Sequence, residues 1–299
     1  LIRTRAIDVV HTHAAFAGRL AARLAGTKGV VYTKHRLDWT RPGWPQKALT
    51  WLNQITCDRV IAISQAVQEA LIAEGMPASH IVLIYNGINV EAFQQEARLT
   101  PREICRAQLG LGNSPVVGIA ARLEPEKGHR CFLETAAQIL QRSTDPVKFL
   151  IVGGGSQAAE LRELAQNRQI ADQVVFTGFR EDIPALLAAM DVVVVPSLTE
   201  AFGLSLVEAM ALAKPCVASA VGGLCEIATD GQTALLIPPG DAEALAEKVL
   251  YLLQNQEEAA ALGTRAAQEV EQRFSATRMV EELTDLYLSL GEGSRGKRC

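Results

Sequence analysis

The chain has 299 residues, of which 48% are apolar and 21% are charged, so it is long enough for two globular domains with sizeable cores. Its six cysteines show no metal-ligand spacing, which excludes a recognisable zinc site and favours reduced thiols. No apolar run reaches the roughly 18 residues of a membrane span, and we find no signal peptide. We therefore expect a cytoplasmic protein whose contact with a membrane would be peripheral.

The net charge of −4 is distributed unevenly along the chain. Residues 1–60 carry a charge of +7, which leaves −11 for residues 61–299. A basic amino-terminal part favours an anionic acceptor or the inner face of an acidic membrane, although a solvated surface explains it equally well. Aromatic residues do not alternate with these cations as a stacking surface for bases requires, so we expect no nucleic-acid partner.

Short apolar runs alternate with helical patterns over the first ninety residues. The four strands predicted there cover residues 7–10, 30–33, 59–63 and 81–84. The first of them ends at His11-Thr12-His13, and the second is followed by a polar loop that holds His35. Four strand-to-helix steps in so short a stretch predict a parallel sheet.

A second series of strands and helices follows a less apolar stretch, residues 90–114, which we interpret as the inter-domain connection with a first helix. Its six predicted strands cover residues 116–120, 149–152, 174–177, 192–195, 216–219 and 235–237. The predicted terminal helices cover residues 241–253, 257–274 and 276–290. The fold class is therefore α/β, with two doubly wound parallel-sheet domains.

The expected domain boundaries follow from this pattern. Residues 1–89 form a first domain and residues 90–274 a second one. We expect the terminal helix, residues 275–290, to pack back on the first domain, and the polar tail, residues 291–299, to be disordered.

Two carboxylates stand near the strand predicted at residues 192–195. The strand runs into Pro196, and the loop after it brings Glu200 to a predicted helix start, with Glu208 about one turn inside the helix. The helix dipole stabilises such carboxylates, so capping is an ordinary explanation for either one. However, the pair lies at the carboxyl end of a parallel strand, where open α/β sheets bind ligands.

Two cations stand at the equivalent end of the second domain's first strand. Arg122 follows this strand, and Lys127-Gly128 opens the next helix. Free N–H groups at a helix start bind phosphate, and a nearby Arg and Lys neutralise a diphosphate. Together with Glu200 and Glu208, they predict a pocket with cations at one end and hydroxyl-accepting carboxylates at the other. A sugar nucleotide has this chemistry.

The glycine run 153–155 formally matches the dinucleotide-binding fingerprint, since it follows a strand and opens a helix. However, the acidic residue expected for a ribose about twenty residues further on is missing, which disfavours NAD. The absence of a GK[ST] sequence excludes a P-loop.

The two histidines at the end of the first strand, His11 and His13, have the spacing of a metal pair. They lack a third ligand nearby in the sequence, so we expect no metal site. We interpret His13 and His35 instead as polar groups that face the inter-domain cleft.

Taken in order, these motifs resemble the carboxyl-terminal domain of the retaining family-4 (group 1) glycosyltransferases of GT-B fold. The motifs are Arg122 with Lys127-Gly128, IVGGGS, FTGF, Glu200-Ala201-Phe202-Gly203 with Glu208, and Gly222-Gly223. DVVHTH, VYTKH, AISQAV and YNGIN add weaker similarity in the first domain. The resemblance implies two Rossmann-like domains that face a cleft.

The resemblance also implies an activity. This is a metal-independent, cofactor-free transfer of a hexose from a UDP- or GDP-sugar to a lipid-linked or cell-envelope glycan acceptor, with retention of the anomeric configuration. The implied catalytic residues are Glu200, Arg122, Lys127 and His35. The implied donor-binding residues are Arg122, Lys127, Gly154, Phe179, Arg180, Glu200, Phe202, Gly203, Leu204 and Glu208. His13 and His35 would lie on the acceptor side.

One departure from the family concerns the start of the chain. Members normally begin with a strand and a glycine-rich loop, which nothing ahead of Ile7 supplies, so we expect an incomplete amino-terminal domain. This leaves open the alternative of a truncated, non-catalytic nucleotide-sugar-binding protein. A sugar-nucleotide epimerase of similar fold would need catalytic acids other than this pair.

Overall fold

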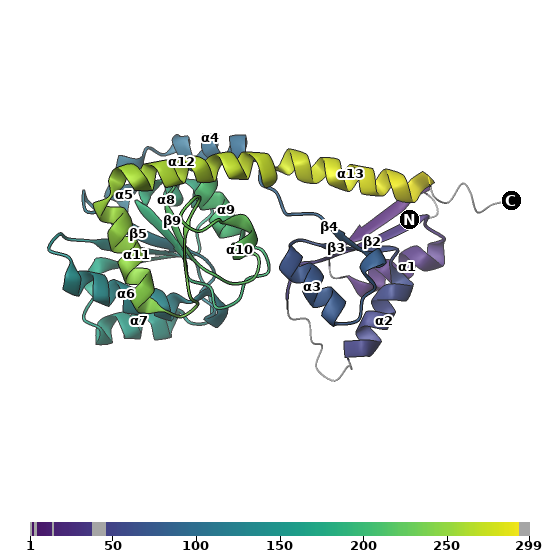
Figure 1. Cartoon of the computed structure of the whole chain (residues 1–299), viewed down its shortest axis with the longest axis horizontal. Coiled ribbons are helices and arrows are strands. Elements are labelled where there is room, and N and C mark those ends of the chain that lie inside the picture. The colour runs from purple at the N-terminus through teal and green to yellow at the C-terminus, as the bar shows by residue number, and fades with distance from the viewer. Residues whose placement is uncertain (1, 3–4, 14, 38–45, 293–299) are drawn as a thin grey trace. The chain divides into compact units, whose positions relative to one another are not determined.

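The structure is a computed structural model that describes residues 2, 5–13, 15–37 and 46–292. Its internal contacts divide the chain into two units, Leu1–Gly87 with Ala276–Cys299, and Ile88–Ser275 (Figure 1). The tail predicted to be disordered lies outside the described residues from residue 293 on. None of the described helices has the length and apolar character needed to cross a bilayer.

The first unit contains a parallel four-stranded sheet in the order β1-β2-β3-β4. The strands are β1 (Val9–Thr12), β2 (Gly29–Lys34), β3 (Arg59–Ala62) and β4 (Ile81–Leu83). The helices are α1 (Phe16–Ala25), α2 (Gln46–Thr56), α3 (Gln65–Ala73), the 3₁₀ turn η1 (Ala78–His80) and α13 (Ala276–Glu292). Because α13 packs on β1 and β2, its Leu286 completes a core with Val31, Ile61 and Ile84.

The first strand begins two residues later than predicted. His11 and Thr12 belong to β1 because they pair in register with Val31 and Tyr32 of β2. Hydrophobic periodicity does not detect polar residues that continue a ladder at a strand end.

The second unit contains a parallel six-stranded sheet in the order β10-β9-β8-β5-β6-β7. Its strands are β5 (Val116–Ala120), β6 (Lys148–Val152), β7 (Val174–Gly178), β8 (Val192–Val195), β9 (Cys216–Ser219) and β10 (Leu235–Ile237). All four valines of β8 are buried, as a continuous apolar run in a parallel sheet predicts.

Helices precede, connect and follow these strands. They are α4 (Val90–Leu99), α5 (Arg102–Gln108), α6 (His129–Arg142), α7 (Ala158–Asn167), α8 (Ile183–Ala189), α9 (Leu204–Ala211), α10 (Leu224–Ile227), α11 (Ala242–Gln254) and α12 (Gln256–Arg273), with 3₁₀ turns η2 (Pro125–Lys127) and η3 (Ala171–Gln173). The stretch predicted as a connection with one helix therefore holds two. The first of them, α4, packs against α8 and α9.

The order of the second sheet reverses between β5 and β8. Strand β5 has β6 and then β7 on one side, whereas β8, later in the chain, pairs on its other side. In open α/β sheets, ligands bind outside the carboxyl ends of the strands at such a reversal. The loops after β5 and β8 are therefore the expected walls of a site.

Candidate functional site

The loop after β8 brings Glu200 to a lysine from the loop after β5. Glu200 Oε2 accepts hydrogen bonds from Lys127 Nζ at 2.7 Å and from Ser197 Oγ at 3.2 Å. The Lys127 side chain is 19% exposed and the Glu200 side chain 11% exposed. The prediction that cations and carboxylates occupy opposite ends of the pocket is wrong for this pair, because the two side chains are in direct contact.

The close approach of these two loops depends on Gly128. Its φ of 74° lies in the left-handed region, and a Cβ added there would lie 1.9 Å from the carbonyl oxygen of Pro196. A backbone hydrogen bond joins the same two loops, in which the Leu198 N–H donates to the Glu126 carbonyl at 2.8 Å. Glycine therefore allows the backbone after β5 to lie directly against the backbone after β8.

Arg122 extends from the end of β5 toward solvent. Its side chain is 68% exposed, and its guanidinium lies 3.3 Å from Glu126 in a surface ion pair. Exposed pairs of this kind contribute little to stability, so the guanidinium can exchange its partner for a ligand anion at small cost.

The glycine run after β6 is held by the loop after β5. Glu124 accepts hydrogen bonds from the Ser156 hydroxyl at 2.7 Å and from the Ser156 N–H at 3.2 Å. These hydrogen bonds hold the pKa of Glu124 below its usual range. In addition, the Leu123 N–H donates to the Gly154 carbonyl at 2.9 Å. Three strand-end loops are thus connected to one another before any ligand binds.

Helix α9 begins beside Glu200 without a capping side chain. Its N-cap is Gly203, with a φ of 117°, and the N–H groups of Leu206 and Val207 donate to the Gly203 carbonyl. Within the described residues, the N–H groups of Leu204 and Ser205 have no such acceptor and remain available to a ligand. The Phe202 ring is buried and packs edge-to-face on Phe274 at 5.7 Å. The ring is therefore used in packing, and the predicted role of the Phe202 backbone in donor binding remains a prediction.

Glu208 lies in the second turn of α9. Burial raises its pKa to about 7. Among the residues that the structure describes, none donates a hydrogen bond to this carboxyl group. A partly buried carboxyl group with a perturbed pKa and no hydrogen-bond donor among the described residues is typical of a functional site.

Residues after β7 form another part of this sheet edge. The Phe179 side chain is 78% exposed, and a Cβ added to Gly154 would lie 3.7 Å from its Cβ atom. Arg180 donates two hydrogen bonds to Asp182, at 2.7 and 2.6 Å, and these raise the pKa of Arg180. Its guanidinium already has a carboxylate partner, which the sequence analysis missed, so its role near a base remains a prediction.

The predicted acceptor-side histidines belong to the first unit, where they lie together. His13 Nδ1 is 2.8 Å from His35 Nε2, and the rings are stacked. His11 lies beside them, with Tyr287 Oη and Thr33 Oγ1 each 2.6 Å from its ring nitrogens. Burial and the neighbouring imidazoles lower the pKa of His11 to about 4 and also lower that of His35. The roles of His13 and His35 toward an acceptor remain predictions.

The sequence analysis did not identify Ser197, which donates to Glu200, or the buried His129 next to Gly128. His129 is fully buried, and neither of its ring nitrogens has a hydrogen-bond partner among the residues that the structure describes. Burial lowers its pKa to about 4, with a smaller effect from Lys127. Nothing in the local sequence indicates this burial, because it depends on how α6 packs in the domain.

Comparison with known proteins gives this site a context. Residues 101–269 match the family model described as glycosyl transferases group 1, and residues 1–92 match the one described as glycosyltransferase family 4. The putative glycosyltransferase EpsD of Bacillus subtilis is 30% identical, over 96% of this chain and 78% of that protein.

A second relative is the UDP-Gal:alpha-D-GlcNAc-diphosphoundecaprenol alpha-1,3-galactosyltransferase of Escherichia coli. It is 28% identical, over 97% of this chain and 77% of that protein. Among solved structures, Anabaena Alr3699/HepE in complex with UDP and glucose superposes with a TM-score of 0.84 and 28% identity, over 96% of this chain and 80% of that one. With its two parallel sheets of the GT-B fold, the chain belongs to the group 1 glycosyltransferases.

Proposed function

We propose that this glycosyltransferase moves a hexose from a UDP- or GDP-sugar to a lipid-linked or cell-envelope glycan acceptor, with retention and without a metal ion. The observation that carries the proposal is the contact between Lys127 and Glu200 at the reversal of the second sheet. The pair supports the proposal because Lys127 could bind a diphosphate while Glu200, one hydrogen bond away, accepts sugar hydroxyls.

The diphosphate would lie on Lys127, Arg122 and the uncapped start of α9. As the bond to the sugar breaks, negative charge builds up on the leaving diphosphate, and cations already in place stabilise that charge. Glu200, which also accepts a hydrogen bond from Ser197, holds the Lys127 ammonium by a hydrogen bond, so little reorganisation is needed. These cations can supply the charge that a metal ion supplies in other transferases, which supports the metal-independent proposal.

The donor sugar and the nucleoside would take the remaining groups. Glu200 keeps one carboxylate oxygen, Oε1, clear of both hydrogen bonds described above and can accept a sugar hydroxyl through it. Glu208 would accept ribose hydroxyls, which favour its ionised form. Phe179 and Arg180 would lie near the base.

The relatives support the choice of donor and acceptor. The solved relative holds UDP and glucose, and the name of the Escherichia coli relative specifies a UDP-sugar and a lipid diphosphate. In this chain we assign the acceptor side to the first unit, with His13 and His35. Its basic charge suits an anionic acceptor or the inner face of an acidic membrane. Flotation with liposomes should depend on anionic lipid, and the same flotation with neutral lipid would contradict membrane contact.

Titration calorimetry with UDP and GDP tests the donor site. One of the two nucleotides should bind, and Lys127→Ala should weaken it about tenfold to a hundredfold, as expected for a lost charge-assisted hydrogen bond. Arg122→Ala should also weaken binding. Arg142→Ala is the matched control, because this exposed arginine on α6 pairs only with surface side chains. Binding of neither nucleotide, or binding that is insensitive to both site changes, would refute the assignment.

Retention and turnover need a product assay. The anomeric proton of a transfer product made from UDP-glucose should show an α linkage in NMR spectra, and a β linkage would refute retention. Nucleotide-sugar binding with neither transfer nor hydrolysis would favour the alternative of a non-catalytic binding protein.

A further inference from the structure

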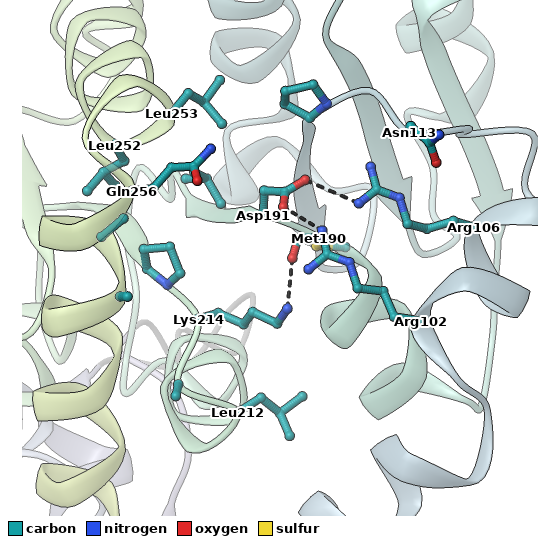
Figure 2. A pocket seen from close by; sticks show the side chains of 16 residues that line it. Arg102, Arg106, Asn113, Met190, Asp191, Leu212, Lys214, Leu252, Leu253 and Gln256 are labelled. Atoms are coloured by element: carbon teal, nitrogen blue, oxygen red, sulfur yellow. Dashed lines mark hydrogen bonds and ion pairs between the residues drawn. The ribbon is translucent and has the colours of Figure 1, made fainter.

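The second unit contains a cavity of about 440 Å³ at the edge of the sheet opposite the donor site (Figure 2). Pro115, Asp191 and Pro215 line it, and each directly precedes a strand, namely β5, β8 and β9. The donor-site residues instead follow the carboxyl ends of β5 and β8. The length of the strands therefore separates the two sites.

The cavity carries three cations around one carboxylate. Arg102 donates to Asp191 Oδ1 at 2.5 Å, and Arg106 lies 3.4 Å from Oδ2, which also accepts from the Val116 N–H at 2.8 Å. The third cation, Lys214, extends into the same space (Figure 2). The four side chains together carry a formal charge of +2.

Part of this network is structural. Arg106 also donates to the carbonyls of Gly112, at 3.1 Å, and Ser114, which holds the loop before β5. Lys214 donates to the carbonyls of Ala188 at 2.6 Å and Met190 at 2.8 Å, at the end of α8. A lysine at these carbonyls suits the negative end of a helix dipole.

Other donors in the cavity are not used. In the described part of the chain, Arg102 makes its side-chain hydrogen bond to Asp191 alone, and the amides of Asn113 and Gln256 make none. The Lys214 ammonium has three N–H groups for two carbonyls. These free donors come from four different segments around one cavity.

We propose that this cavity is a second anion-binding site, which takes a small organic phosphate. The dianion of a phosphate monoester matches the charge of +2, and Arg102 presents a fork of donors suited to phosphate oxygens. The volume lies within the roughly 300–1,000 Å³ of small-molecule sites. Leu212, Leu252 and Leu253 line the cavity as well and would contact the carbon part of the ligand.

The ionisation of Lys214 gives the site a pH signature. Burial lowers the pKa of Lys214 to about 8, assisted by Arg102 and Arg106 and opposed by Asp191 and Cys216. A bound dianion favours the protonated amine. A phosphate monoester is a dianion only above about pH 6. Phosphate affinity should therefore be highest between about pH 6 and pH 8 and should fall as the pH rises above 8.

Titration calorimetry of the full chain with phenyl phosphate tests the proposal. Phenyl phosphate should bind at pH 7, bind more weakly at pH 9, and bind equally well when UDP saturates the donor site. Phenol, which lacks the phosphate, should not bind. No binding of phenyl phosphate, or its loss when UDP is added, would overturn the proposal.

Two substitutions locate the binding. Arg102→Gln should weaken phenyl phosphate about tenfold or more, because it removes a charged donor but leaves the Arg106 and Asp191 network. Lys127→Ala, in the donor site, should leave this affinity unchanged while it weakens nucleotide binding. Arg142→Gln is the matched surface control, and circular dichroism checks that each variant is folded. An unchanged affinity in Arg102→Gln, or a loss in Lys127→Ala, would overturn the second site without affecting the donor-site proposal.

Discussion

Replacing Gly128 with alanine tests whether backbone contact holds the two halves of the donor site together. Its φ of 74° costs an alanine about 1 kcal/mol. The added Cβ would lie 1.9 Å from the Pro196 carbonyl oxygen, so the backbone must shift to make room for it. A shift of this kind costs about 1–3 kcal/mol more. We therefore expect Gly128→Ala to lower the free energy of unfolding by roughly 2–4 kcal/mol.

The matched control is Gly110→Ala. Gly110 has a similar φ of 66°, but a Cβ there would meet no atom within 4 Å, so only the first cost, about 1 kcal/mol, applies. Urea unfolding followed by circular dichroism measures both losses. Gly128→Ala should also weaken UDP binding, because it displaces the segments that carry Lys127 and Glu200, whereas Gly110→Ala should not. Equal losses of stability in the two variants would refute the close-approach reasoning.

Three further substitutions test individual buried groups by the same unfolding assay. Because the folded-state pKa of Glu208 is raised from 4.5 to about 7, the wild type should lose up to about 3 kcal/mol of stability as pH rises between these values. The Glu208→Gln variant should not show this loss. A stability profile of the variant that falls with pH as steeply as that of the wild type would contradict the prediction. His129 has its pKa lowered from 6.5 to about 4, so the wild type should lose stability as pH falls through this range. His129→Leu should remove this acid sensitivity. It should also raise the free energy of unfolding by about 1 kcal/mol at pH 7.5, because both ring nitrogens are buried without a partner among the described residues. A variant that is less stable than the wild type at pH 7.5 would show that the imidazole has a partner. Asp191→Ala leaves the Arg106 side chain, which is 10% exposed, without its carboxylate partner. This should lower the free energy of unfolding by about 3 kcal/mol. A loss below about 1 kcal/mol would show that solvent takes the place of the Asp191 carboxylate.

The strands of the second unit could be predicted from the sequence because a parallel sheet buries both faces. Strands β5, β8, β9 and β10 begin and end at the predicted residues. Their continuous β-branched or apolar runs, each closed by a breaker or a polar turn, define both ends. The stretch around α4 was harder to predict, because this helix buries none of its residues fully and therefore shows a weak apolar pattern.

The sequence predicts a set of donor-site residues, which remains a prediction, but it does not predict the contacts that the structure shows among them. The Lys127–Glu200 pair joins residues 73 positions apart and depends on β8 lying beside β5, which no local pattern specifies. The Asp182 partner of Arg180 is only two residues away, yet its geometry depends on the turn before α8. His129 is a charged-type residue at a helix start, and only packing reveals that it is buried and neutral.

The loops of the donor site are joined chiefly through their main chains. Leu198 to Glu126, Leu123 to Gly154 and Gly223 to Glu200 are all N–H to carbonyl bonds between different loops. Side chains such as Phe179 and Leu204 take no part in these bonds. Under the proposed assignment of Phe179 to the base and Leu204 to the sugar, substitutions at these two positions should change the preferred donor while the main-chain bonds between the loops persist. Donor preference should then change more readily than the ability to hold a nucleotide.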